Sequence, residues 1–122
     1  MVYIGALLFI GGQVLTDEAG EFRFVTIKPG AYPWRNQPFG WRPAHIHFSL
    51  FGSCNAERLI TQMFFPGDPL LPIDPIYNSP PDPAVRARML AGLELESGIE
   101  EVALGYRFEI VLGGRRATPM GH

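Results

Sequence analysis

Alternation of apolar and polar side chains predicts two paired strands in the middle of the chain. Residues 44–51, AHIHFSLF, alternate with a period of two, so that the histidines and the core-forming residues leave opposite faces. The apolar face carries Ala44, Ile46, Phe48 and Leu50. Residues 57–65, ERLITQMFF, predict the neighbouring strand of a hairpin across residues 52–56.

Three further segments have strand or helix patterns. Residues 21–27, EFRFVTI, alternate and predict the second arm of a hairpin that begins at residues 13–16, because residues 16–22 hold the Asp and Gly of a tight turn. Residues 103–112 predict a last strand with Tyr106, Phe108, Ile110 and Leu112 on one side. Residues 83–95 predict a short helix, because Asp82 can cap it, Pro83 suits its first turn and apolar residues recur on one face.

About five strands and one helix make the predicted fold mainly β, most simply a β-sandwich in a single domain of residues 1–122. Prolines make residues 31–43 irregular, and residues 66–83 form a long proline-rich connection of the kind that often carries function. The opening run MVYIGALLFIGG is too short to span a bilayer and lacks the features of a signal peptide. We expect a core strand there.

Composition excludes several classes of function. The chain is 47% hydrophobic and 18% charged, with a formal net charge of −2, so it can build a core and offers no basic surface for nucleic acid or anionic membranes. Its single cysteine, Cys54, cannot form an internal disulfide. This usage fits a reducing, cytoplasmic location.

His45 and His47 are the first candidates for metal ligands. At positions i and i+2 of a strand they leave the same face with Cα atoms roughly 7 Å apart, so one ion is within reach of both. Tyr32 lies on a loop just upstream, and a phenolate added to two imidazoles suits ferric iron better than zinc. The alternatives are two hydrogen-bonded histidines on a polar strand face and a buried aromatic residue after a turn.

Other polar residues can complete such a site. Arg42 cannot act as a base, so near a metal it would stabilise an anion, and Gln62 can offer its amide to a substrate. A surface salt bridge and a cross-strand hydrogen bond are the alternatives for these two residues. Asp68 or Asp74 in the long loop could instead complete a two-histidine, one-carboxylate ferrous site.

Four stretches together carry a resemblance to a known family: IKPGAYPWRN, WRPAHIHFSLFG, LITQMFFPGDPLLPIDPI and YRFEIVLGGRRAT. In them the chain closely resembles the intradiol ring-cleaving dioxygenases, in particular the iron-bearing chains of the protocatechuate type. The resemblance runs from about Gly12 to Thr118 and implies a β-sandwich with non-haem Fe(III). It implies that Tyr32, His45 and His47 are iron ligands, and that Tyr32 leaves the iron when substrate chelates and then accepts a substrate proton. Arg42 would stabilise charge on the activated ring. Gln62 would line the substrate pocket and Trp34 would lie near its mouth.

The reaction that the resemblance implies is cleavage of protocatechuate by O2 to 3-carboxy-cis,cis-muconate, a step of aromatic catabolism in the β-ketoadipate pathway. It also implies an alpha-chain partner in a hetero-oligomer. The family binds iron with a second tyrosine that would precede Met1, and Tyr3, Tyr77 and Tyr106 do not match its position. We therefore expect the C-terminal portion of a catalytic domain. A truncated, non-catalytic remnant that folds or pairs with a partner is the alternative, and a cupin-like His-x-His binder is a third.

Overall fold

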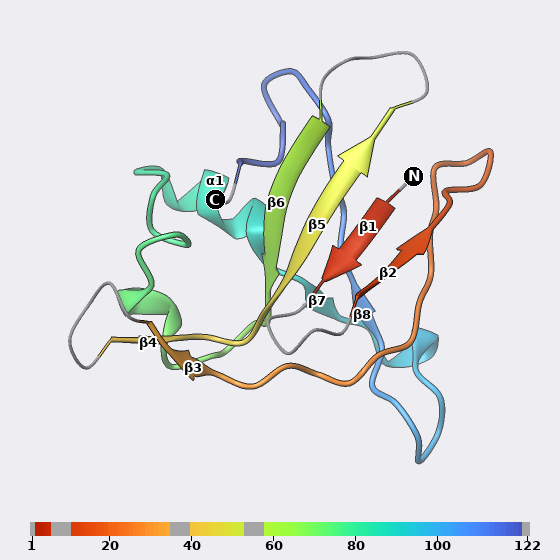
Figure 1. Ribbon diagram of the computed structural model, residues 1–122, viewed down its shortest axis with the longest axis horizontal. Coiled ribbons are helices and arrows are strands. Elements are labelled where there is room, and N and C mark those ends of the chain that lie inside the picture. The colour runs from red at the N-terminus through yellow and green to blue at the C-terminus, as the bar shows by residue number, and fades with distance from the viewer. Residues whose placement is uncertain (1, 6–10, 35–39, 53–57, 121–122) are drawn as a thin grey trace.

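The computed structural model describes residues 2–5, 11–34, 40–52 and 58–120 of the 122-residue chain. Its main feature is a four-stranded antiparallel sheet with the order β2-β1-β5-β6 (Figure 1). The four strands are β1 (Val2–Gly5), β2 (Gly11–Val14), β5 (His45–Phe51) and β6 (Arg58–Phe64). The mainly β prediction with one short helix is confirmed.

The predicted central hairpin is confirmed as β5 and β6, which pair antiparallel from His45 opposite Phe64 to Phe51 opposite Arg58. The residues that link these strands, including Cys54, lie largely outside the described part of the chain. The expected N-terminal strand is present as β1, which pairs with both β2 and β5. Residues 6–10 of that apolar run are outside the described residues.

The core lies on the face of β5 opposite the histidines. Its buried members are Ala44, Ile46, Phe48, Met63, Phe65 and Ala91. Phe48 is 1% exposed and packs against Phe22, Phe24 and Phe108 at ring-centroid distances of 5.9, 6.1 and 5.4 Å. Aromatic pairs at this spacing add to the stabilisation from apolar burial.

Two segments cover this core without forming the long strands that their alternation predicts. Residues 21–27 join no ladder in the described structure, although Phe22 and Phe24 point inward as the pattern requires. In the segment 103–112, β8 (Tyr106–Arg107) pairs with β7 (Gly92–Leu93), and Ala103 forms only an isolated antiparallel bridge with Ile99. Tyr106, Phe108 and Ile110 pack against the core, whereas Leu112, predicted on the same side of the strand, is 68% exposed. Alternation encodes which side chains face the core, but ladder pairing also needs a strand at hydrogen-bonding distance.

The turn before this segment is confirmed. The Asp17 N–H donates to Glu21 O at 2.9 Å, and the Gly20 N–H donates to Asp17 O at 3.0 Å. Gly20 has a φ of 78°, which glycine adopts without strain. The Asp17 carboxylate also accepts from the N–H groups of Ala19 and Glu21.

The predicted helix over residues 83–95 is wrong beyond its first turns. Helix α1 spans Pro83–Arg86, followed by the 3-10 turn η2 (Ala87–Met89). Leu90 is then extended, and the Ala91 N–H donates to Phe64 O at 2.8 Å. This hydrogen bond holds the chain in an extended conformation beside β6, so the helix ends before it. Asp82 caps α1 as predicted, since its side chain accepts from the Ala84 N–H at 2.9 Å.

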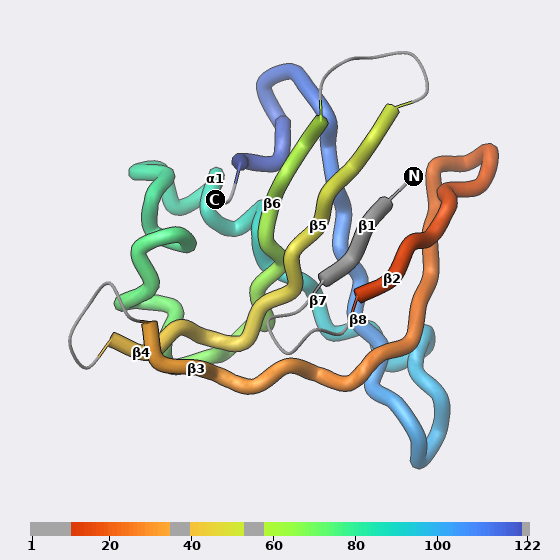
Figure 2. The backbone as a smooth tube through the Cα atoms, in the orientation of Figure 1, coloured from red at the N-terminus to blue at the C-terminus, as the bar shows by residue number. Residues whose placement is uncertain are grey.

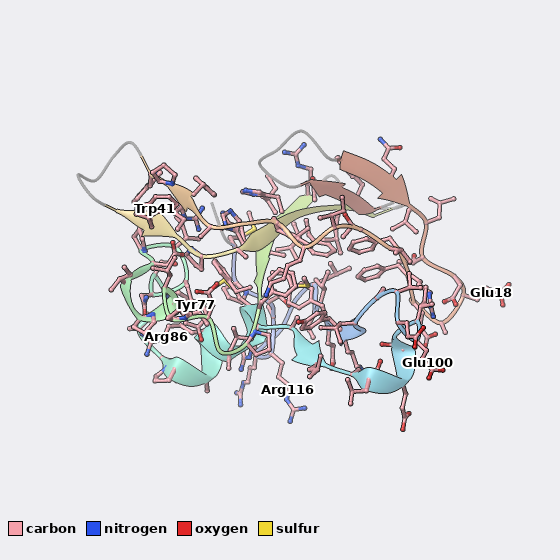
Figure 3. The ribbon with its side chains drawn as sticks, turned by 90° about the horizontal axis from the view of Figure 1, so that it is seen from below. Glu18, Trp41, Tyr77, Arg86, Glu100 and Arg116 are labelled. Carbon is pink, nitrogen blue, oxygen red and sulfur yellow. The ribbon has the colours of Figure 1, made fainter. Side chains whose placement is uncertain are left out.

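A small ribbon and two 3-10 turns complete the structure. The ribbon pairs β3 (Tyr32–Pro33) with β4 (Trp41–Arg42), and the turns are η1 (Leu71–Ile73) and η3 (Leu95–Ser97). The chain reaches β3 along the lower side of the sheet, seen as the orange stretch of the tube (Figure 2). Trp41 and Tyr77 lie at one end of the molecule, and Glu18 and Glu100 at the other (Figure 3). No helix in the described residues could cross a membrane.

Candidate metal centre

The two histidines of β5 leave the same face of the sheet, as their spacing predicts. Their ring centroids lie 5.0 Å apart. His45 is 3% exposed and His47 is half-buried. Across the hairpin, His47 lies opposite Gln62 and His45 opposite Phe64, whose ring is 5.7 Å from the His45 ring.

The β3–β4 ribbon brings Tyr32 to this face. Tyr32 lies directly opposite Arg42 in the ribbon, and its ring centroid is 5.6 Å from that of His45. Because β4 is followed closely by β5, with only Pro43 and Ala44 between, the ribbon is held against the histidine strand. Three potential ligands from two separate parts of the chain, Tyr32, His45 and His47, are therefore brought together.

Arg42 lies at the centre of this group with its side chain only 6% exposed. Nε and Nη2 bind Asp74 Oδ1 and Oδ2 at 2.8 and 3.1 Å, and Nη2 also donates to Gln62 Oε1 at 2.8 Å. Nη1 lies 3.3 Å from Tyr32 Oη and 3.2 Å from His45 Nε2. A guanidinium has five N–H donors, and here each has an acceptor.

The hydrogen bonds of His45 define its tautomer. Nδ1 lies 2.8 Å from Pro43 O, which can only accept, and Nε2 faces a guanidinium nitrogen, which can only donate. The ring is therefore neutral, with its proton on Nδ1 and its Nε2 lone pair on the side of Tyr32 and Arg42. A backbone carbonyl that holds the second ring nitrogen is the usual support of a metal-binding histidine.

Burial controls the charges in this group. Desolvation lowers the pKa of His45 to about 4, and the Arg42 cation also lowers it, against the hydrogen bond to Pro43. Desolvation and Arg42 lower the pKa of His47 as well. Burial acts to lower the pKa of Arg42, but the hydrogen bond and charge of Asp74 outweigh it and raise that pKa. Both imidazoles are thus neutral near pH 7, the form that binds a metal.

The two-histidine, one-carboxylate option is wrong for the described residues. Both Asp74 oxygens bind Arg42, and Oδ2 also accepts from the Tyr77 N–H at 2.8 Å. Asp68 Oδ1 accepts from the Leu70 N–H within its own turn. Within the described residues, no three His, Cys, Asp or Glu side chains form a group that could hold a metal.

Gln62 and Trp34 are the remaining predicted site residues. Gln62 on β6 is 2% exposed and accepts a hydrogen bond from Arg42 on β4, so it faces the histidine side rather than solvent. Trp34 is half-buried at the end of β3. Its backbone N–H donates to Gly40 O at 2.8 Å and closes the ribbon. Trp41 is 50% exposed.

Two partners in this group were not predicted. Asp74 had the wrong expected role, since it pairs with Arg42 instead of binding a metal, and the Pro43 carbonyl was not considered. A carboxylate inside an apolar, proline-rich loop was the available signal for Asp74, because buried acids are almost always paired. No local pattern marks a backbone carbonyl as a histidine partner.

The donor set fits ferric iron. It offers two neutral imidazoles and one phenol oxygen on one face. With the proton on Nδ1, His45 would coordinate through Nε2, where a bound metal would take the place of the Arg42 N–H. Phenolate is a hard oxygen ligand, which suits a hard Lewis acid such as Fe(III). Zinc sites, by contrast, favour thiolate and imidazole.

Comparison with known proteins identifies the family of this chain. A family model described as Dioxygenase matches residues 7–114. The chain is 58% identical over 113 residues to the protocatechuate 3,4-dioxygenase beta chain of Burkholderia cepacia, covering 92% of this chain and 48% of that protein. It is 35% identical over 78 residues to a 6-chlorohydroxyquinol 1,2-dioxygenase of Cupriavidus pinatubonensis, covering 55% of this chain and 28% of that protein. It is also 36% identical over 75 residues to a chlorocatechol 1,2-dioxygenase of Rhodococcus opacus, covering 52% of this chain and 29% of that protein.

The chain thus spans at most about half the length of these relatives. The family match itself covers nearly all of the chain, including the ribbon, the histidine strand and the proline-rich loop. All three relatives are named as dioxygenases. The chain therefore belongs to the intradiol dioxygenase family.

Proposed function

We propose that this chain provides the iron-binding half of a protocatechuate-cleaving intradiol dioxygenase, with non-haem Fe(III) held by Tyr32, His45 and His47. The observation that carries the proposal is the meeting of Tyr32 Oη and His45 Nε2 at a single atom, Arg42 Nη1, with the His47 ring beside them. The 58% identity to a protocatechuate 3,4-dioxygenase beta chain supports protocatechuate and O2 as substrates and 3-carboxy-cis,cis-muconate as product.

Ferric iron, when bound, supplies a Lewis acid that draws charge from a catecholic substrate and prepares its ring for O2. Arg42 contributes a buried, permanently charged donor group that stabilises negative charge on the substrate. Tyr32 Oη accepts a proton from a substrate hydroxyl, and the nearby Arg42 Nη1 holds that oxygen in place at 3.3 Å.

The rest of the proposed pocket comes from the neighbouring elements. Gln62 on β6 lies opposite His47 and lines the wall, and the half-buried Trp34 stands at the mouth. A flat aromatic acid suits walls built of aromatic rings with a few fixed polar groups.

We also propose an alpha-chain partner and a hetero-oligomer in the cytoplasm. The name of the beta-chain relative supports the partner. The single cysteine supports a reducing location.

The direct test is to load the purified chain with Fe(III), measure bound iron and record the visible spectrum. We expect one iron per chain and a tyrosinate-to-iron absorption band that shifts when protocatechuate is added. Tyr32→Phe should abolish the band, whereas Tyr106→Phe should retain it, because Tyr106 packs edge-on against Phe65 in the core. Stoichiometric iron with no response to protocatechuate would refute the substrate assignment.

A non-catalytic chain that folds or pairs without holding iron firmly is the second candidate. It is favoured because neither Tyr77 nor Tyr106 is placed to act as a second tyrosine ligand. Tyr77 packs on Phe64 and Tyr106 on Phe65, and no contact in the described structure joins either tyrosine to the histidines. The same experiment separates the two, because this candidate predicts a colourless protein from which a mild chelator removes all iron.

A further inference from the structure

Asp74 belongs to the proline-rich loop, yet its carboxylate reaches the centre of the candidate metal site. It is fully buried, at 0% exposure, and it forms the one ion pair found among the described residues. Both of its oxygens bind the Nε and Nη2 edge of Arg42. A two-point contact of this kind fixes the plane of a guanidinium as well as its position.

The loop holds Asp74 as firmly as Asp74 holds Arg42. Its Oδ2 accepts from the Tyr77 N–H at 2.8 Å, and its carbonyl accepts from Asn78 Nδ2 at 2.7 Å and from the Asn78 N–H at 3.0 Å. The Asp74 N–H in turn donates to Leu71 O at 3.3 Å. Four local hydrogen bonds therefore hold Asp74: the one from the Tyr77 N–H reaches its carboxylate, and the other three hold its backbone.

The guanidinium is rigid and planar, so fixing one edge fixes the direction of the other. With Nε and Nη2 bound by Asp74, the Nη1 protons can only point toward Tyr32 Oη and His45 Nε2. Asp74 also balances the charge of Arg42. A bare buried cation next to the histidines would oppose the binding of a metal cation there, whereas a neutral pair would not.

We propose that Asp74 is the positioning residue of the site: it aims Arg42 Nη1 at the Tyr32 oxygen and cancels the charge of Arg42 toward the metal. The role assigned to the metal rests on the proposed function. The competing explanation is that the ion pair only ties the loop to the sheet. Asn78 supplies the matched control, because its side chain ties the same loop through Leu71 O and Asp74 O without touching Arg42.

The test compares Asp74→Asn with Asn78→Ala, first without metal. In the iron-free, nitrogen-15-labelled chain, we expect separate, slowly exchanging NMR signals for the Arg42 side-chain N–H groups. Asp74→Asn should accelerate their exchange roughly tenfold or more and merge the Nη signals, since charge-assisted hydrogen bonds are about twice as strong as neutral ones. Asn78→Ala should leave them within about twofold of the parent chain. If Asp74→Asn does not fold, Asp74→Glu keeps the charge but not the two-point fit and should give a smaller loss in the same direction.

The second measurement uses the Fe(III)-loaded chain. Asp74→Asn should shift the tyrosinate band and weaken iron binding against a chelator, and Asn78→Ala should do neither. In an Arg42→Lys background the guanidinium is absent but the positive charge remains, so Asp74→Asn should shift the band less than in the parent chain while still weakening iron binding.

The two proposals fail in different ways. A parent chain that binds no iron refutes the proposed function, while the iron-free NMR measurement still decides whether Asp74 orients Arg42. Unchanged Arg42 signals in Asp74→Asn, or equal changes in Asn78→Ala, would overturn the positioning role and leave Asp74 as a tether of the loop.

Discussion

The buried neutral His45 makes a specific prediction about pH and stability. In the unfolded chain its imidazole titrates with the ordinary pKa of 6.5, whereas desolvation lowers its pKa in the folded chain to about 4. Between these values the unfolded state binds a proton that the folded state does not. The free energy of unfolding must therefore fall as the pH falls through this window. The stability that depends on a neutral His45 is fully present above pH 6.5.

The magnitude follows from the two pKa values. Moving one proton between a group of pKa 6.5 and one of about 4 corresponds to about 3 kcal/mol, at about 1.36 kcal/mol for each pH unit. His47 contributes with the same sign, because its pKa is also lowered by burial and by Arg42. A loss of this size is a large fraction of the stability of a small domain.

The assay is urea unfolding of the iron-free chain at pH values from 7.5 to 4, with His45→Gln as the matched variant. Other titrating groups contribute to both proteins, so the difference between their free energies of unfolding isolates His45. We expect the parent chain to lose about 3 kcal/mol more than His45→Gln over this range. Equal pH dependence of the two proteins would refute the claim that the folded state keeps His45 neutral.

Three further perturbations test the packing and the ion pair. Phe48→Ala should lower the free energy of unfolding by about 3–5 kcal/mol, because Phe48 is 1% exposed among aromatic rings. In the same urea titration, Leu15→Ala should change it by less than about 0.5 kcal/mol, because Leu15 is 73% exposed. Arg42→Met should lower the free energy of unfolding by about 3–5 kcal/mol, because it leaves Asp74 buried without its cation. The double variant Arg42→Met with Asp74→Leu should recover most of that loss, and no recovery would contradict this reasoning. Asp82→Ala should cost about 1 kcal/mol in thermal unfolding through the lost cap of α1, and Asp68→Ala shows whether any loop aspartate has that effect.

Local sequence signals were reliable where one short segment contains its own cause. The alternation of residues 44–51 and 57–65 predicted the β5–β6 hairpin and the common face of His45 and His47, because strand geometry alone fixes that face. The turn at Asp17 and the cap at Asp82 were likewise predicted, since their hydrogen bonds close within two to four residues.

Segments whose partners are distant in sequence were predicted less well. Residues 21–27 and most of 103–112 supply inward aromatic rings but join no long ladder in the described structure. The expected helix over residues 83–95 stops early, because the backbone of Ala91 bonds to Phe64 on β6. Propensity at the end of a short helix is weak, and a tertiary hydrogen bond overrides it.

The sequence by itself determined the candidate ligands, the face they share and the resemblance that connects them to ring cleavage. Only the tertiary structure decided how those ligands are supported. The pairing of Asp74 with Arg42, 32 residues apart, and the bond from His45 to the Pro43 carbonyl depend on where the folded chain brings the loop and the ribbon. Such contacts form because buried charges and imidazoles must find partners away from water. Which partner is nearest is settled by the fold.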